Sequence, residues 1–392
     1  MNSKPPDLPD FDHCLVNLAN SILQHFGAET TAPTLSMADK VLDQRSRNIV
    51  VLLLDALGTS ILDLHCAPDG FFRSHLLGNY NSVFPPTTVA ATTAINTGLF
   101  PCENGWLGWD TYFPKLGKNV TTFLNVDSLT EKNLPPEPTD DPSVPPMPPL
   151  NEQKPAADFN AAFTYCSYSS VVQKINDAGG NAYFSSPFVE PFPKDIDAIL
   201  ERVTTLCREP GKKYIYAYWN EPDTTMHRYG VKSSEAHDMI LSLEEKVRVF
   251  AEGLPEDTLL FITADHGHMD SKNFCLMDYP EILDCLVRMP SIEPRALNLF
   301  VKEEKKDGFP DLFHKTFGEN FLILSRDEVI KYGVFGKGTE HPEFRGMLGD
   351  FLAISTGPES ILNTHYEAHY MVGGHAGLTK EEYEIPILAV MT

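Results

Sequence analysis

Three short stretches of the chain are almost continuously apolar, and each one leads into an aspartate. The stretches cover residues 49–54, 214–219 and 258–264, and the aspartates that follow are Asp55, Asp223 and Asp265. Such runs are typical of strands buried on both faces, as in a parallel sheet. Amphipathic helices are predicted over 15–26, 195–206 and 233–254, where apolar side chains recur every three or four positions. Alternation of strands and helices indicates an α/β fold.

Two segments interrupt this alternation. Residues 133–155 are rich in proline, which does not fit helix interiors or central strands, so a loop is expected there. Residues 271–342 are expected to form a smaller inserted subdomain. Because ligands of open α/β sheets bind beyond the carboxyl ends of the strands, the three aspartates are expected at one edge of the sheet.

The composition narrows the possible partners. The 392-residue chain has a formal net charge of -23, which argues against a broad nucleic-acid surface but allows a small phosphate ester bound through metal ions. Its seven cysteines form no CxxC pair and indicate reduced thiols. Neither a signal peptide nor an apolar run of about 20 residues is found, so a cytoplasmic protein without a membrane span is expected.

A pair of threonines opens a further helical pattern. Thr87 and Thr88 follow two prolines, and Gly98 is expected to end the helix. Free N–H groups and the helix dipole at this N-terminus favour an anion such as a phosphoryl group. Capping the helix is the commoner role for threonine there. As a nucleophile, Thr88 would need a base or a metal ion, because its hydroxyl is too weakly acidic.

Histidines accompany the aspartates. They are His227, four positions after Asp223, His266 and His268, just after Asp265, and His375, in a glycine-rich stretch. Aspartate and histidine together are typical zinc ligands, and the oxygen ligands also allow manganese or magnesium. Taken singly, these stretches fit a solvated Asp–His pair, a turn and a tight glycine loop. Their common position after strands favours convergence of the side chains.

The ordered series of motifs is similar to that of a known enzyme family. VVLLLDALG, FPPTTVAATTAINTGLFP, NEPDTTMHRYG, TADHGHMD and GGHAGL together resemble the alkaline phosphatase superfamily, in the nucleotide pyrophosphatase/phosphodiesterase branch that includes phosphonoacetate hydrolase. The resemblance runs from Asn48 to the C-terminus. It implies one catalytic domain over 1–392, an alkaline phosphatase-like three-layer sandwich with a mostly parallel central sheet flanked by helices.

The same resemblance implies a site for two divalent metal ions, usually zinc. One ion would be bound by Asp223, His227 and His375, and the other by Asp55, Asp265 and His266. Thr88 would be the nucleophile and would contact the second ion, by its register relative to Gly98, and Thr87 is the alternative if that register slips. His268 is expected at most to orient a ligand.

One position departs from the family pattern. Trp109 stands where members that act on nucleotides usually carry a phosphate-binding Asn, and Asn104 lies nearby but out of register. Both are candidate substrate contacts, although aromatic residues here also suit core packing. The expected function is hydrolysis of phosphate esters, foremost as a phosphodiesterase or nucleotide pyrophosphatase. A phosphomonoesterase or phosphonate hydrolase is the alternative. A sulfatase ranks lower, because the CxPxR context of sulfatases is missing. A non-catalytic metal-binding protein also ranks lower.

Overall fold

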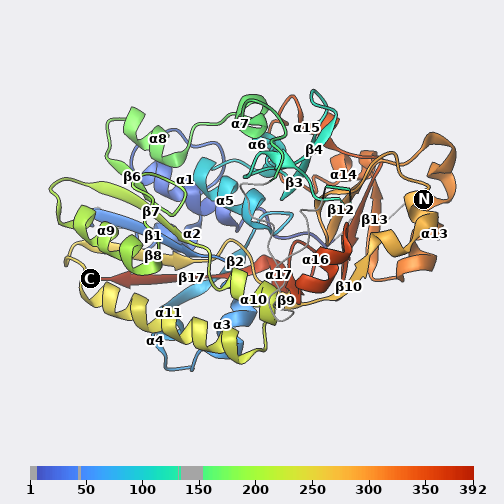
Figure 1. The fold of residues 1–392 in the computed structure, drawn as a ribbon. Helices are drawn as coiled ribbons and strands as arrows, with labels where there is room; N and C mark the ends of the chain where they lie inside the picture. The colour runs from blue at the N-terminus through green and yellow to red at the C-terminus, as the bar shows by residue number, and fades with distance from the viewer. Residues whose placement is uncertain (1–6, 43–45, 131, 134–152) are drawn as a thin grey trace.

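The computed structural model describes residues 7–42, 46–130, 132–133 and 153–392. A six-stranded sheet with helices on both faces lies beside a second, seven-stranded sheet (Figure 1). The proline-rich loop predicted over 133–155 lies almost wholly outside the described residues. Within the described ranges, no helix is both long and apolar enough to cross a bilayer.

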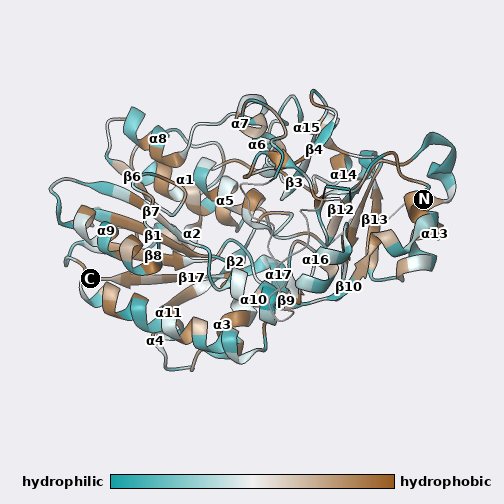
Figure 2. Cartoon of the chain, viewed as in Figure 1, coloured by the Kyte–Doolittle hydropathy of each residue, from teal (hydrophilic) through white to brown (hydrophobic). Residues whose placement is uncertain are grey.

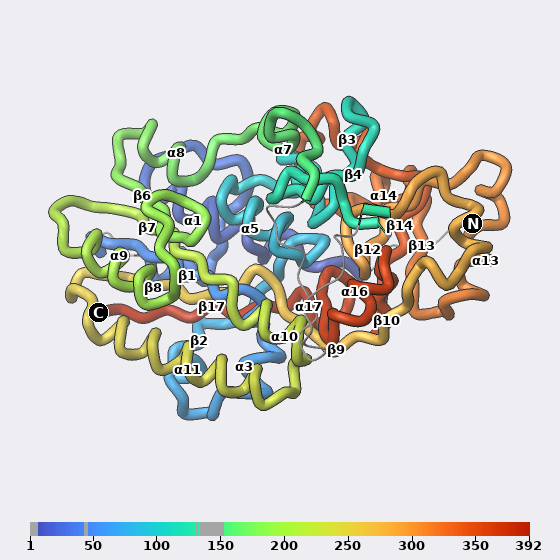
Figure 3. Tube along the Cα trace, viewed as in Figure 1, coloured from blue at the N-terminus to red at the C-terminus, as the bar shows by residue number. Residues whose placement is uncertain are grey.

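The central sheet is mostly parallel, as predicted. Its strands, in spatial order, are β2 (Leu76–Asn81), β17 (Glu384–Met391), β8 (Thr258–Thr263), β1 (Asn48–Leu54), β7 (Lys213–Trp219) and β6 (Ala182–Ser185). Strand β1 pairs in parallel with β7 and β8, and β6 pairs in parallel with β7, whereas β17 runs antiparallel to β8 and β2. Segments from the start, middle and end of the chain therefore lie side by side (Figure 3).

Helices cover both faces of this sheet, and several of them carry apolar residues on one side (Figure 2). One layer consists of α1 (Leu15–His25), α5 (Thr88–Thr97) and α8 (Val171–Asp177); the other includes α3 (Thr59–His65), α4 (Phe71–Ser74), α9 (Ile196–Arg208) and α11 (Ser234–Glu252). Helix α5 ends at Gly98, whose φ of 71° is the left-handed conformation that suits glycine. The helices predicted over 15–26, 195–206 and 233–254 are confirmed.

The second sheet is antiparallel and brings together distant segments. Its strands, in spatial order, are β13 (Phe321–Ser325), β14 (Phe351–Ser355), β12 (Ala296–Leu299), β11 (Ser291–Glu293), β3 (Asp110–Phe113), β4 (Lys118–Thr121) and β5 (Val126–Asp127). The segment 271–342 supplies only part of this sheet, since β3, β4, β5 and β14 come from outside it. The bounds of the expected subdomain stay a prediction.

Short elements connect the two sheets or cover them. Two small ribbons are formed by β9 (Met269–Asp270) with β16 (Gly373–Gly374) and by β10 (Lys272–Cys275) with β15 (Glu359–Leu362). The remaining helices of the described ranges are α2 (Ser36–Asp39), α6 (Pro101–Asn104), α7 (Ala161–Tyr165), α10 (Asp223–Tyr229), η2 (Leu276–Asp278), α12 (Pro280–Leu283), η3 (Glu303–Gly308), α13 (Phe309–Phe317), α14 (Arg326–Lys331), α15 (Phe344–Met347), α16 (His365–Tyr370) and α17 (Lys380–Tyr383). A separate apolar core forms where Phe309, Phe313 and Phe317 of α13 pack on the second sheet.

Candidate active site

The ends of β1, β7 and β8 are linked to one another by hydrogen bonds. Asp55 directly follows β1, and its carbonyl accepts a hydrogen bond of 3.2 Å from the N–H of Asp223 at the start of α10. Asp265 follows β8, and its Oδ1 accepts a hydrogen bond of 3.0 Å from the N–H of Ala56. The three carboxylates therefore lie at one edge of the sheet, as the sequence predicts.

A first cluster forms around Asp55. Nε2 of His266 lies 3.3 Å from Oδ1 of Asp55 and 3.7 Å from Oδ2 of Asp265. Oγ1 of Thr88 lies 3.2 Å from the same histidine nitrogen and 3.4 Å from Oδ2 of Asp55. The hydroxyl of Tyr218 donates a hydrogen bond to Oδ2 of Asp55 and fixes that carboxylate.

A second cluster forms around Asp223. Its Oδ1 lies 3.4 Å from Nε2 of His227 and 3.7 Å from Nε2 of His375. His375 belongs to the C-terminal part of the chain and directly follows the β9–β16 ribbon. Its ring stacks on the ring of His266, with 3.8 Å between the two ring centroids. The two clusters are thus adjacent.

Backbone carbonyls orient the histidine rings. Nδ1 of His227 donates to Gly373 O at 2.9 Å, Nδ1 of His375 to Pro86 O at 3.1 Å, and Nδ1 of His266 to Gly267 O at 2.9 Å. Because a carbonyl can only accept, Nδ1 carries the proton in each ring and the Nε2 lone pair faces the cluster. This is the arrangement typical of metal-binding histidines.

Burial and crowding determine the charge states of these groups. Desolvation, followed by the neighbouring Asp265 carboxylate, holds the pKa of Asp55 and the pKa of Asp223 well above the usual range. Desolvation lowers the pKa of His227 to about 4 and holds the pKa of His375 well below the ordinary value. The fold therefore favours neutral imidazoles, the form that binds metals.

The donor atoms fit divalent metal ions. Asp55 Oδ1, Asp223 Oδ1 and Asp265 Oδ2 are buried and have no hydrogen-bond partner among the described residues. Unpartnered buried carboxylate oxygens are costly, and a cation would satisfy them. Groups of three ligand atoms within 4.8 Å of one another include Asp55, Asp265 and His266, as well as Asp223, His266 and His375. The described residues thus offer candidate metal clusters at both aspartates.

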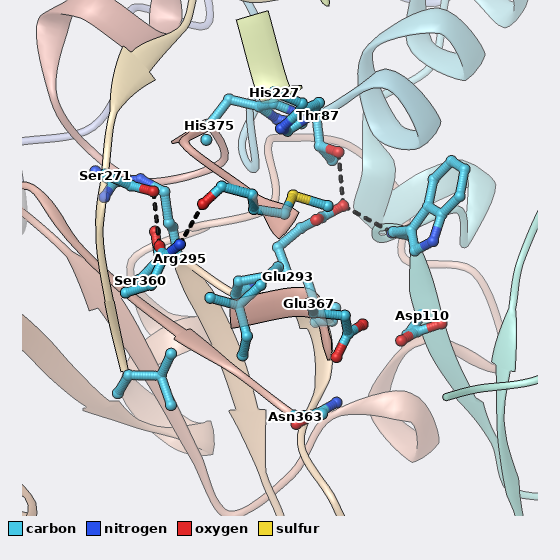
Figure 4. Close-up of a pocket in the computed structure, with 18 of the residues that line it drawn as sticks. Thr87, Asp110, His227, Ser271, Glu293, Arg295, Ser360, Asn363, Glu367 and His375 are labelled. Carbon is cyan, nitrogen blue, oxygen red and sulfur yellow. Dashed lines mark hydrogen bonds between the residues drawn. The ribbon is translucent and has the colours of Figure 1, made fainter. Parts of the chain in front are cut away.

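A cavity of about 270 Å³ lies beside the clusters, between the central and second sheets. Figure 4 shows His227, His375 and Thr87 at one end and Asp110 and Asn363 at the other. Glu293 lies between them; its Oε1 accepts hydrogen bonds from Thr87 Oγ1 at 2.6 Å and Trp109 N at 2.7 Å. Burial raises the pKa of Glu293 to about 8.

Two threonines at the start of α5 and two residues near the cavity were also predicted to belong to the site. Thr88 is the first residue of α5 and Thr87 its N-cap, but neither side chain caps the helix, so capping does not occupy these hydroxyls. Trp109 lines the cavity and is 42% exposed. Asn104 is not brought to the cavity, because its amide is committed to Leu99 O and Trp106 N in its own loop.

Several neighbours of the site were not identified from the sequence. Tyr218 belongs to the apolar run of β7 and carries no separate signal there. Arg295 and Glu382 form a fully buried ion pair, with Nε–Oε1 at 2.6 Å. Glu382 also accepts a hydrogen bond of 2.7 Å from Gly377 N, so this pair holds the loop after His375 against the second sheet. Thr379 and Glu382 also form a capping box at the start of α17.

Comparison with known proteins places this geometry in context. A model of the family described as type I phosphodiesterase / nucleotide pyrophosphatase matches residues 49–309, more than half of the chain. No curated protein matches the sequence significantly.

Solved structures share the fold over most of the chain. Human ectonucleotide pyrophosphatase/phosphodiesterase 5 is 15% identical, with a TM-score of 0.61 and 87% of each chain covered. An inactive variant of the murine protein in complex with AMP is 14% identical, with a TM-score of 0.60 and 87% of each chain covered. Phosphonoacetate hydrolase from Sinorhizobium meliloti 1021, in complex with phosphonoacetate, is 14% identical, with a TM-score of 0.56, over 88% of this chain and 90% of that one. At these identities, the similarity shows the alkaline phosphatase-like fold.

Proposed function

Because the chain belongs to the type I phosphodiesterase/nucleotide pyrophosphatase family and is thus a hydrolase of phosphoester bonds, we propose that it cleaves phosphodiesters in a metal-dependent reaction with Thr88 as nucleophile. The observation that carries this proposal is the position of the Thr88 hydroxyl. It lies within 3.4 Å of both His266 and Asp55, at the first residue of a ten-residue helix.

Two metal ions are part of the proposal. One would be held by Asp55, Asp265 and His266, and the other by Asp223, His227 and His375. Bound there, the ions would supply Lewis-acid chemistry, lowering the pKa of a hydroxyl and neutralising charge on phosphoryl oxygens. The mixed Asp and His donors suit zinc first, with manganese or magnesium as alternatives.

The chain itself would position and attack the phosphoryl group. The hydroxyl of Thr88 loses its proton and its oxygen forms a bond to phosphorus, while the bond from phosphorus to the leaving alkoxide breaks and the alkoxide takes up a proton to leave as an alcohol. Water then hydrolyses the phosphothreonine and restores the hydroxyl. The first N–H groups of α5 have no acceptors within the helix, so they can hold phosphoryl oxygens during both steps.

The acidic cavity favours diesters over monoesters. Carboxyl groups of Asp110 and Glu367 line it, together with Glu293, which is mostly protonated at neutral pH because its pKa is about 8. At neutral pH a phosphodiester carries one negative charge, whereas a monoester carries up to two, so the cavity repels a diester less. The neighbour crystallised with AMP makes nucleotide diesters the first natural candidates to examine.

The test is turnover of bis-p-nitrophenyl phosphate by zinc-loaded protein. We expect hydrolysis that chelation abolishes and added zinc restores, with slower release from p-nitrophenyl phosphate and from phosphonoacetate. Activity that survives exhaustive chelation would contradict the metal requirement. Faster turnover of the monoester or of phosphonoacetate would contradict the diester preference and support the corresponding alternative.

A further inference from the structure

His268 is the one histidine at this edge of the sheet for which the proposed metal sites give no direct role. It follows β8, two positions beyond His266, and is 1% exposed. Its Nε2 is buried and has no hydrogen-bond partner within the described ranges. A buried imidazole nitrogen without a partner needs an explanation.

The ring of His268 points its Nε2 toward Asp223. That nitrogen lies 3.5 Å from Oδ1 of Asp223, which likewise has no hydrogen-bond partner among the described residues. The separation is too long for a charge-assisted hydrogen bond, which would be about 2.7–2.9 Å. The pair is therefore close without being bonded, as two ligands of one ion would be.

Four of the six separations among Asp223, His227, His268 and His375 are close to those of a tetrahedral metal site. Oδ1 of Asp223 lies 3.4 Å from Nε2 of His227, 3.5 Å from Nε2 of His268 and 3.7 Å from Nε2 of His375. Nε2 of His227 and Nε2 of His375 are 3.2 Å apart. Ligand atoms about 2.0–2.1 Å from a tetrahedral zinc ion would be about 3.4 Å from one another. Asp223, His227 and His268 also form a candidate ligand group by themselves.

Gly373 leaves room for this ring. A Cβ on Gly373 would lie 2.6 Å from Cε1 of His268, closer than side-chain carbons approach. The carbonyl of the same glycine orients His227 by accepting its Nδ1 proton at 2.9 Å. Gly373 thus leaves room for the ring of His268, and its carbonyl orients the ring of His227 toward Asp223.

We propose that His268 is a fourth protein ligand of the metal centre formed by Asp223, His227 and His375. The inference rests on the proposed function, because it concerns one of the two proposed ions. Four protein ligands close a zinc site, whereas three leave a position open. The centre at Asp223 would then have four protein ligands, whereas the centre at Asp55 would have three, with Thr88 beside it.

Cobalt binding tests the assignment without measuring turnover. We expect metal-free protein titrated with Co²⁺ to gain the intense visible absorption of a tetrahedral ion. In His268→Gln this absorption should shift and weaken, because water would replace one nitrogen ligand of the ion at Asp223. Affinity for zinc, measured by competition with a chromophoric chelator, should fall at one of two sites by more than the roughly 10–100-fold typical of residues that only orient a ligand.

His268→Cys provides a second test, whether or not the glutamine variant folds. Only a thiolate bound to the ion adds a sulfur-to-cobalt charge-transfer band in the near ultraviolet, so we expect this band to exceed any seen in the wild type. The control is His65→Gln, since His65 is buried on α3 and belongs to no candidate metal group within the described residues. It should leave the cobalt spectrum unchanged.

The outcomes separate this inference from the proposed function. A wild-type cobalt spectrum that is unchanged in His268→Gln, or a His268→Cys spectrum without the added band, would overturn the fourth ligand while leaving metal-dependent turnover intact. Failure of the wild type to bind any cobalt or zinc would overturn both.

Discussion

Nε2 of His227 lies 3.2 Å from Nε2 of His375, although 148 positions separate the two residues along the chain. Each ring donates its Nδ1 proton to a backbone carbonyl, so two nitrogen lone pairs face each other. This contact is unfavourable without a cation between the rings. The fold therefore holds the two histidines in an arrangement that metal binding would stabilise.

We expect metal removal to lower the stability of the whole protein. An ion that binds only the folded state, at a free concentration about a thousandfold above its dissociation constant, adds about 4 kcal/mol per site. Thermal unfolding of chelator-treated and zinc-loaded protein measures the difference as a shift in Tm. An unchanged Tm, with metal analysis confirming the two loading states, would contradict this prediction.

Above about pH 6.5, where the histidines of the site are neutral in both the folded and the unfolded state, the metal-free protein should become less stable as the pH rises. The pKa values of Asp55 and Asp223 are raised in the fold, so between about pH 4 and those raised values the folded state binds more protons than the unfolded state. Their stabilising protonation is therefore lost as the pH increases. Urea unfolding in the presence of chelator at about pH 7 and about pH 9, above the ordinary histidine pKa, measures the effect. In Asp55→Asn, the free energy of unfolding should depend less on pH than in the wild type. An equal pH dependence in the variant would argue against protonation of Asp55 as the cause.

Thr88→Ala should reduce phosphodiester turnover by roughly 10³-fold or more, in line with the loss of other catalytic nucleophiles. Thr88→Ser should retain measurable turnover, because it keeps the hydroxyl. The readout is kcat on bis-p-nitrophenyl phosphate, with Thr93→Ala as a control, since Thr93 is buried elsewhere on α5. Full activity in Thr88→Ala would remove Thr88 as the nucleophile, and a large loss in Thr87→Val alone would favour its neighbour.

Glu293→Gln should stabilise the protein at alkaline pH. The pKa of Glu293 is about 8, so its folded-state proton favours folding at low pH and is lost as the pH rises from about 4.5 through 8. Glutamine resembles the protonated acid and can still accept hydrogen bonds from Thr87 and Trp109. The gain over wild type in urea unfolding should grow with pH to the order of a few kcal/mol by pH 9. Glu319→Gln, at an exposed side chain, should show no such trend.

Arg295→Met should destabilise the protein by about 3–5 kcal/mol, because it leaves the carboxylate of Glu382 buried without its partner. Combining it with Glu382→Gln should recover part of that loss, which a double-mutant cycle in urea measures. Zinc affinity should also fall in Arg295→Met, since Glu382 holds the loop after His375. A cost below about 1 kcal/mol would indicate that the ion pair is not coupled to the rest of the site.

The central sheet and the residues at its edge were accessible from the sequence because their signals are local. The run 49–54 is buried over its whole length, and parallel strands must end at a common edge, which places Asp55, Asp223 and Asp265 together. The expected cytoplasmic location is not addressed by the structure and stays a prediction.

The second sheet and its contribution to the cavity were not accessible in the same way. Strands β11 and β12 are three and four residues long, and β11 pairs with β3 from a distant segment. The roles of Glu293 and Arg295 follow from their burial and from the residues they contact, not from their residue types. These contacts exist only once the strands have paired, so the sequence does not reveal them. Likewise, the alignment of His268 with Asp223 depends on how the chain turns after β8.

The spread of the ligands along the chain has a consequence for biosynthesis. Asp55, Asp265 and His266 all precede the last quarter of the sequence, whereas the cluster at Asp223 needs His375. All protein donors of the first cluster are therefore synthesised before the donor that completes the second. The second cluster cannot form until His375 has been added to the chain.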